Sequence, residues 1–146
     1  MSVTNPGRLP HNQGEEKMNE LRTTTLTTPL GPITIAVRGE TLCCLTFGAL
    51  NGAERRRLLA RFPGAAIEER PDRSGVAAAL RAYFAGDLHA IDTIAVDTGG
   101  TPFQASVWAA LRRIPVGRTI SYGELARDVG RPAAIRAVGQ ANGANP

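Results

Sequence analysis

The spacing of apolar positions predicts three helices between residues 101 and 146. Apolar residues recur at intervals of three and four from Pro102 to Arg113, from Tyr122 to Val129, and again after Pro132. The first two helices start with a capping box, a Ser or Thr followed three residues later by Glu or Gln. Gly130 suits a left-handed C-terminal cap, and Pro132 suits the start of the third helix. This order of helix, short turn and helix is typical of helix-turn-helix DNA-binding units.

The third of these helices has two faces of different chemistry. Its apolar stripe, which we expect to be buried, consists of Ala134, Ile135, Val138 and Ala141. Arg136, Gly139 and Gly143 fall on the opposite face. A glycine inside a helix costs about 1 kcal/mol relative to alanine, so Gly139 is best explained where another backbone approaches closely. A DNA phosphate backbone would meet that description.

The residues before position 99 predict a separate α+β unit. Residues 1–22 contain prolines, glycines and mixed charges without periodicity, which predicts a disordered tail. Residues 23–98 then form the α+β domain, and adjacent glycines in Asp97 to Gly100 mark a boundary before a helical domain over 99–146. The elements expected in the first domain are strands over Ile33 to Val37, Leu42 to Phe47 and Ala90 to Val96, a helix over Ala53 to Phe62, and a second helix that Ser74 caps and Gly86 ends.

The charge distribution favours a polyanionic partner for the helical part. Formal net charge is +4 over 146 residues. Residues 1–100 are balanced, while residues 101–146 hold six arginines against Glu124 and Asp128, so the whole surplus lies there. Arginine is well suited to binding phosphates. No apolar run is long enough for a membrane span and no signal peptide is visible, so we expect a soluble cytoplasmic protein without a membrane partner.

The thiols and imidazoles predict no metal site. Cys43 and Cys44 are adjacent, and His11 and His89 are too sparse to complete a zinc site. On a strand, neighbouring side chains point to opposite faces, so we expect one cysteine to be buried and the other partly exposed. The sequence also contains no convincing pair of nucleophile and base, no phosphate-cradling glycine loop and no serine elbow.

Several runs of the sequence are similar to one known family. They are GTPFQ from Gly100, VWAAL from Val107, IPVGRTISYGELA from Ile114 and RAVGQANGANP from Arg136, with LRAYFAG from Leu80 and TPLGPI from Thr28 upstream. Over residues 24–146 the chain therefore resembles the 6-O-alkylguanine-DNA alkyltransferases, also called methylated-DNA–protein-cysteine methyltransferases.

This resemblance implies a small ribonuclease-H-like α+β domain followed by a winged-helix-like domain that grips the minor groove of double-stranded DNA. Family members flip an alkylated guanine out of the duplex and move the alkyl group from its 6-oxygen onto a cysteine of the protein, once per molecule. Extrusion leaves a gap in the base stack that a side chain must fill. Arg136 corresponds to the family's arginine finger, Tyr122 to its phosphate-contacting tyrosine, and Asn145 to the asparagine that joins the recognition helix to the active-site loop.

The DNA-binding residues expected on this basis are Tyr122, Arg131, Arg136, Gly139, Asn142 and Gly143, with Tyr122 and Asn145 supporting the chemistry. We expect a monomer that needs no cofactor. In the family, a Pro-Cys-His-Arg motif follows Asn-Pro closely, and its cysteine thiolate is the nucleophile, whereas this sequence stops at Pro146. The C-terminally incomplete chain is therefore expected to transfer no alkyl group. A non-catalytic lesion-binding protein and a plain helix-turn-helix regulator are the alternatives.

Overall fold

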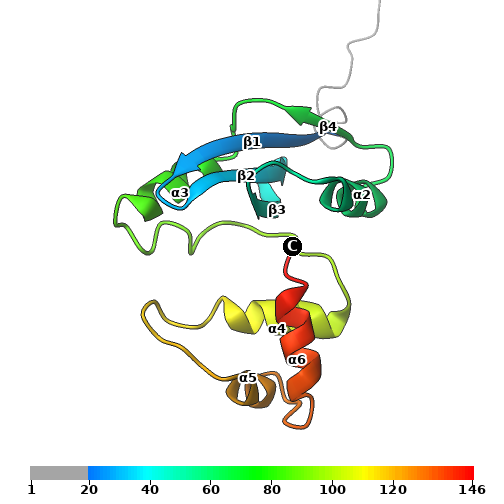
Figure 1. Ribbon diagram of the computed structural model, residues 1–146, viewed down its shortest axis with the longest axis vertical. Helices are drawn as coiled ribbons and strands as arrows, with labels where there is room; N and C mark the ends of the chain where they lie inside the picture. The colour runs from blue at the N-terminus through cyan, green and yellow to red at the C-terminus, as the bar shows by residue number, and fades with distance from the viewer. Residues whose placement is uncertain (1–19) are drawn as a thin grey trace, which may run out of the picture.

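The structure, a computed structural model, describes residues 20–146 and forms two units that follow each other along the chain (Figure 1). The first is a sheet with two helices and the second is a group of three helices. The α+β class and the division into a sheet unit and a helical unit are therefore confirmed. The disordered tail expected over residues 1–19 lies outside the described residues.

The sheet of the first unit is mixed and has the strand order β3-β2-β1-β4. Its elements are β1 (Glu20–Thr28), β2 (Gly31–Arg38), β3 (Thr41–Phe47), α2 (Gly52–Arg61), β4 (Ala66–Glu69) and α3 (Val76–Phe84). The hairpin predicted between the second and third strands is confirmed, since β2 and β3 pair antiparallel. Strand β4 pairs parallel with β1. Two apolar clusters cover this sheet, one with α3 and one with α2.

Strand β1 was not predicted, and its first three residues were wrongly assigned to the tail. The strand begins at Glu20, and Leu21 is fully buried. Its run of threonines hides the apolar alternation, but threonine is β-branched and favours strands. The hydroxyls also find partners across the sheet: Thr23 donates to the carbonyl of Glu68, and Thr25 shares a hydrogen bond with Thr34. Hydrogen bonds between strands therefore stabilise a segment whose sequence is mostly polar.

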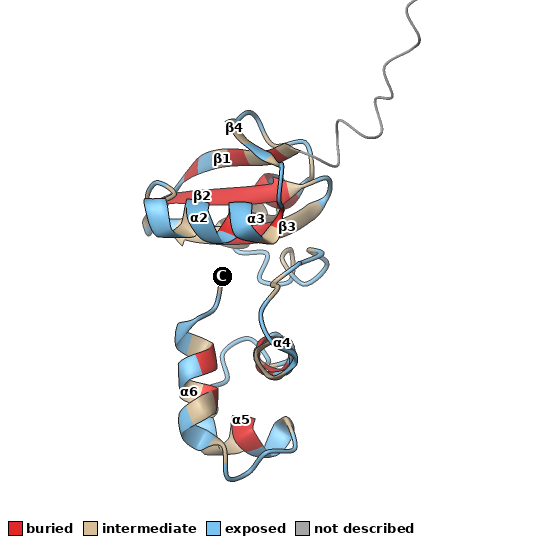
Figure 2. Ribbon diagram, turned by 90° about the vertical axis from the view of Figure 1, so that its right-hand side faces the viewer, coloured by how far each residue is buried: buried red, intermediate tan, exposed pale blue. Residues whose placement is uncertain are grey.

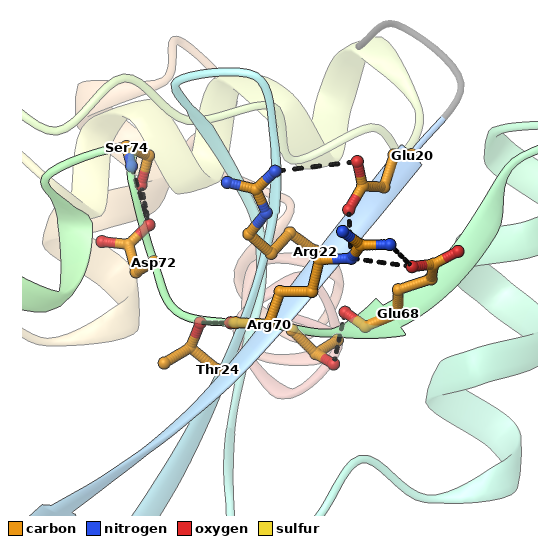
Figure 3. Close-up of polar contacts among 8 residues, drawn as sticks. Glu20, Arg22, Thr24, Glu68, Arg70, Asp72 and Ser74 are labelled. Atoms are coloured by element: carbon orange, nitrogen blue, oxygen red, sulfur yellow. Dashed lines mark hydrogen bonds and ion pairs between the residues drawn. The ribbon is translucent and has the colours of Figure 1, made fainter. Parts of the chain in front are cut away.

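Charged side chains hold the unpredicted strand β4 beside β1 (Figure 3). Arg70, just after β4, forms ion pairs with Glu20 of β1 and with Glu68 of β4. Arg22 also pairs with Glu20, at 3.6 Å. A four-residue strand gives little signal in a sequence, because it forms by backbone pairing with β1, whose residues lie more than forty positions away.

Two further expectations for this unit were wrong. The strand expected over residues 90–96 is absent: residues 90–93 form turns, and only Val96 makes an isolated parallel bridge, to Leu42. The N-cap of α3 is Gly75, whose φ of 87° suits glycine, and not Ser74. Ser74 still accepts a hydrogen bond from the backbone of Val76, while Asp72 accepts one from the amide of Ala77. Because the N-cap residue is a glycine and the side chains that accept from the first helical amides precede it, the sequence shows no standard capping pattern here.

The helical unit contains α4 (Pro102–Leu111), α5 (Tyr122–Asp128) and α6 (Ile135–Gly143). Both predicted capping boxes are present, Thr101 with Gln104 and Ser121 with Glu124. Figure 2 shows the buried positions of all three helices turned toward one another. They form a core of Val107, Ala110, Leu125, Ala126, Val138 and Ala141.

Helix α6 begins at Ile135, three residues later than expected, and one residue of its expected apolar stripe is exposed. Val138 and Ala141 are in the core as predicted, but Ile135 is 49% exposed. In a helix, residues separated by four and seven positions share a face. Ile135 therefore shares its face with Gly139 and Asn142. Of the four residues in the predicted buried stripe, only Val138 and Ala141 are buried.

Trp108 joins α4, α6 and the segment that links the two units. Its indole Nε1 donates to the carbonyl oxygen of Ala141 at 2.8 Å, inside the protein. The far edge of the ring lies against Gly100, where an added Cβ would come within 2.6 Å of the ring carbons. Gly100 has a φ of 77°, in the left-handed region. Space and backbone conformation thus both require glycine at this position.

We expect Gly100→Ala to lower the free energy of unfolding of the helical unit by about 3 kcal/mol, since it combines left-handed strain with overpacking against a buried ring. Gly117→Ala is the matched control: its φ is 79°, but nothing lies within 4 Å of the added Cβ. It should cost only about 1–2 kcal/mol. Urea unfolding followed by the fluorescence of Trp108, the one tryptophan of the chain, measures both. Equal losses would show that the indole does not constrain Gly100.

A candidate DNA-binding face and two interdomain cavities

Helix α5, the turn after it and the start of α6, which carry Tyr122, Arg131 and Arg136, lie at the end of the helical unit farthest from the sheet (Figure 1). Figure 1 shows α6 starting at that end and running back toward the sheet, so that the C-terminus lies between the two units. The start of α5 and the first half of α6 therefore face solvent together, whereas Asn145 lies at the other end, next to the first domain.

Tyr122 is the first residue of α5 and lies across α6. It is 48% exposed, and its hydroxyl accepts a hydrogen bond of 3.3 Å from the side-chain amide of Asn142. Its ring is the closest neighbour of Gly139, where an added Cβ would lie 3.4 Å from the ring. The structure thus brings Tyr122, Gly139 and Asn142, three of the six predicted DNA-binding residues, into one contact.

The contact with Tyr122 revises the explanation of Gly139. The glycine was expected to admit a DNA backbone, but the group that approaches it in the structure is the tyrosine ring. A Cβ at 3.4 Å would make an ordinary van der Waals contact with that ring. The structure therefore does not demand glycine here for packing alone, and Gly139 keeps the ring and the helix axis close together.

The capping box at the start of α5 fixes the backbone next to Tyr122. The carboxylate of Glu124 accepts hydrogen bonds from the amide and the hydroxyl of Ser121, at 2.7 and 2.9 Å. These bonds, from the backbone first and then from the hydroxyl, lower the pKa of Glu124 below its usual value. The carboxylate is therefore ionised at neutral pH, where it stabilises the N-terminus of the helix. Tyr122 thus projects from a rigid helix start.

The six arginines of the helical unit do not all serve the same face. Arg131 and Arg136 are exposed at the turn before α6 and in its first turn, as expected for DNA contacts. Arg112 instead donates to the carbonyl of Ile94 at 2.8 Å, and Arg113 donates to the carbonyl of Ala109. Arg112 thereby ties the end of α4 to the last turns of the first domain. The count of charges could not show that Arg112 and Arg113 bind backbone carbonyls of the protein itself.

Asn145 lies apart from the other predicted site residues, at two adjacent cavities between the units. These cavities have volumes of about 520 and 510 Å³, and both are lined by Cys43, Cys44, Trp108, Asn145 and Pro146. Gly143, the last residue of α6, borders the second cavity and has open space around its Cα. The structure therefore separates the predicted residues into a group at the far end of the helical unit and a group at the cavities.

Both cysteines are buried, which corrects the expectation that one would be partly exposed. Cys43 is 2% and Cys44 is 7% exposed, and both belong to one apolar cluster. The ladder between β2 and β3 shifts here: Ala36 is opposite Cys44 and Val37 is opposite Leu42, which leaves Cys43 as a bulge. A bulge interrupts the alternation of faces, so two neighbouring side chains can enter the same cluster.

Burial makes these two thiols poor nucleophiles. The pKa of Cys43 and that of Cys44 are both raised, in each case mainly because burial disfavours the thiolate. Within residues 20–146, no three His, Cys, Asp or Glu side chains are grouped as metal ligands. None of the helices in that range is long and apolar enough to cross a membrane.

Comparisons with known proteins agree with this division into two units. Residues 21–98 match the model of the 6-O-methylguanine DNA methyltransferase ribonuclease-like domain. Residues 102–146 match the model of the DNA-binding domain of 6-O-methylguanine DNA methyltransferase.

Curated relatives carry one name, methylated-DNA–protein-cysteine methyltransferase. A relative from Mycobacterium bovis is 43% identical over 122 residues, which are 84% of this chain and 69% of that protein. A relative from Shigella flexneri is 58% identical over 72 residues, which are 49% of this chain and 42% of that protein. The chain thus spans less than half the length of the enterobacterial relative that it matches.

Solved structures give the same result at the level of the fold. The crystal structure of Mycobacterium tuberculosis OGT in complex with DNA aligns with a TM-score of 0.69 and 38% identity, covering 86% of this chain and 71% of that one. The crystal structure of M. tuberculosis O6-methylguanine methyltransferase aligns with a TM-score of 0.69 and 37% identity, over 86% and 72% of the two chains. Together with the two domain matches, these findings show that the chain belongs to the 6-O-methylguanine DNA methyltransferase family.

Proposed function

We propose that this protein takes part in the repair of alkylated guanine in double-stranded DNA, and that the described chain supplies the part that binds the duplex and extrudes the base. In the whole reaction, the alkyl group passes from the 6-oxygen of guanine to a cysteine thiolate of the protein, once per molecule. The carbon–oxygen bond breaks, a carbon–sulfur bond forms, and the guanine recovers its proton. No cofactor is needed, since the thiolate is both the nucleophile and the acceptor.

The arrangement around Tyr122 carries this proposal. An exposed aromatic ring at a capped helix start contacts Gly139 and Asn142 of the following helix, and the exposed Arg136 lies three residues before Gly139 on that helix. Extruding a base requires contacts that turn the target nucleotide and a side chain that occupies the gap in the stack. Tyr122 suits the first role and the guanidinium of Arg136 suits the second. Arg131 is placed for a phosphate contact.

Cys43 and Cys44 do not suit the role of alkyl acceptor. Both are buried and have a raised pKa, so little thiolate is present at neutral pH. They also line cavities at the end of the helical unit opposite Tyr122 and Arg136. We therefore assign them to packing in the first domain. Asn145 is assigned to the junction where the DNA-binding helix meets the cavities.

We expect Arg136→Ala to weaken binding to a duplex that carries one 6-O-methylguanine by about tenfold, and to weaken binding to the unmodified duplex much less. The reason is that an intercalating side chain acts only where a base has been extruded. Fluorescence anisotropy at fixed salt measures both affinities.

Arg131→Ala is the control for this experiment. A phosphate contact should lower both affinities by the same factor and reduce the salt dependence by about one counterion. If Arg136→Ala behaved in the same way as this control, Arg136 would be an ordinary phosphate contact, and a sequence-reading regulator would regain support. If the unaltered chain bound the two duplexes equally, the lesion-directed function would be refuted.

A second expectation concerns Gly139. Gly139→Ala should leave the protein as stable as before or raise the free energy of unfolding by up to about 1 kcal/mol, because alanine favours the helix and its methyl group only touches the Tyr122 ring. DNA affinity should nevertheless fall severalfold, for modified and unmodified duplexes alike, because the methyl group obstructs the approaching DNA backbone. Thermal unfolding and anisotropy measure the two effects. An unchanged affinity would show that DNA does not approach Gly139.

A further inference from the structure

Ile135 is an aliphatic side chain that the fold exposes next to Arg136. Although the apolar pattern predicted burial, 49% of its surface is open to solvent. The cause is geometric, because Ile135 shares a helix face with Gly139 and Asn142 and lies beside the stripe that enters the core. Single exposed aliphatic residues are common and need no explanation. The neighbours of Ile135 are what make its position informative.

The second exposed apolar side chain of this region is Tyr122, and it occupies the same helix face. Tyr122 packs on Gly139, one turn beyond Ile135, while a Cβ added to Gly123 would lie 3.9 Å from Cδ1 of Ile135. The side chain of Ile135 is therefore held against the start of α5 and projects into solvent beside the tyrosine. Arg131 and Arg136 are exposed on either side of it in the sequence. The result is a small apolar ridge in basic surroundings.

We propose that Ile135 is an apolar wedge that enters the minor groove next to Arg136 and unstacks the base step beside the target guanine. The proposal rests on the function proposed above. Proteins that bind the minor groove often insert aliphatic side chains between base steps, and the kink that results increases the contact area. The planar guanidinium of an arginine can stack in the gap left by the extruded base, but it is smaller than that base and leaves part of the neighbouring base face uncovered. An isoleucine at the first position of α6 supplies that cover.

The test separates a wedge from a residue that only supports Tyr122. Two duplexes carry one 6-O-methylguanine with 2-aminopurine as the adjacent base. In one the lesion lies opposite cytosine, and in the other it lies opposite an abasic site, where the stack is already loosened. A wedge offsets the free energy of unstacking. Removing it should therefore weaken binding to the intact duplex strongly and binding to the loosened duplex only slightly. Loss of support for Tyr122 would weaken binding to both.

We expect Ile135→Ala to weaken binding to the intact duplex about fivefold and to the loosened duplex less than about twofold, and to reduce the rise in 2-aminopurine fluorescence on binding. Ile135→Leu should restore both readouts, because it keeps the aliphatic volume. Leu59→Ala removes a similarly exposed aliphatic side chain on α2, 42% exposed, and should change neither. Circular dichroism verifies that all three variants are folded.

Equal losses on the two duplexes, or no loss on the intact one, would overturn the wedge while leaving the repair function in place. A wild-type chain that binds the intact duplex no better than unmodified DNA would overturn the function and the wedge together. A fluorescence rise that Ile135→Ala leaves unchanged would also refute the wedge, even if affinity fell.

Discussion

The hydrogen bond from the Trp108 indole to the carbonyl of Ala141 is the contact on which the arrangement of the site depends. It fixes the C-terminal half of α6 against α4, while the same ring packs on Gly100 in the segment between the two units. The indole N–H is a buried donor, and leaving it without an acceptor would cost about 1–3 kcal/mol. One side chain thus joins α4, α6 and the segment that links the two units.

This constraint gives the two ends of α6 different roles. The first turn points away from the sheet and presents Ile135 and Arg136 together with Tyr122. The other end delivers Asn145 to cavities that are walled by β3 and α4. Because a helix is rigid, α6 holds a base extruded beside its first turn at a constant distance from Asn145 at its other end. Arg112, bound to the carbonyl of Ile94, reinforces this geometry from the other side of the cavities.

Local signals in the sequence predicted the helical unit well and the sheet only in part. Both capping boxes and the β2–β3 hairpin depend on residues close in sequence, so they were recognisable. Strand β4 depends on a parallel backbone ladder with β1, a pairing of distant residues that leaves no local pattern. The shared burial of the two cysteines followed from a β-bulge, which interrupts the alternation on which burial predictions rest. The exposure of Ile135 reflects its place beside the buried stripe of α6.

The family assignment came from continuous runs of residues, whereas the geometry of the site required the structure. Sequence comparison marked Tyr122 and Gly139 separately, and the structure showed that they touch. The central claim is that this face extrudes a base, and a crystal structure of the chain bound to a duplex with one 6-O-methylguanine tests it most directly. We predict a guanine outside the stack with the guanidinium of Arg136 in its place. A stacked guanine, or a duplex bound to another face, would contradict the account.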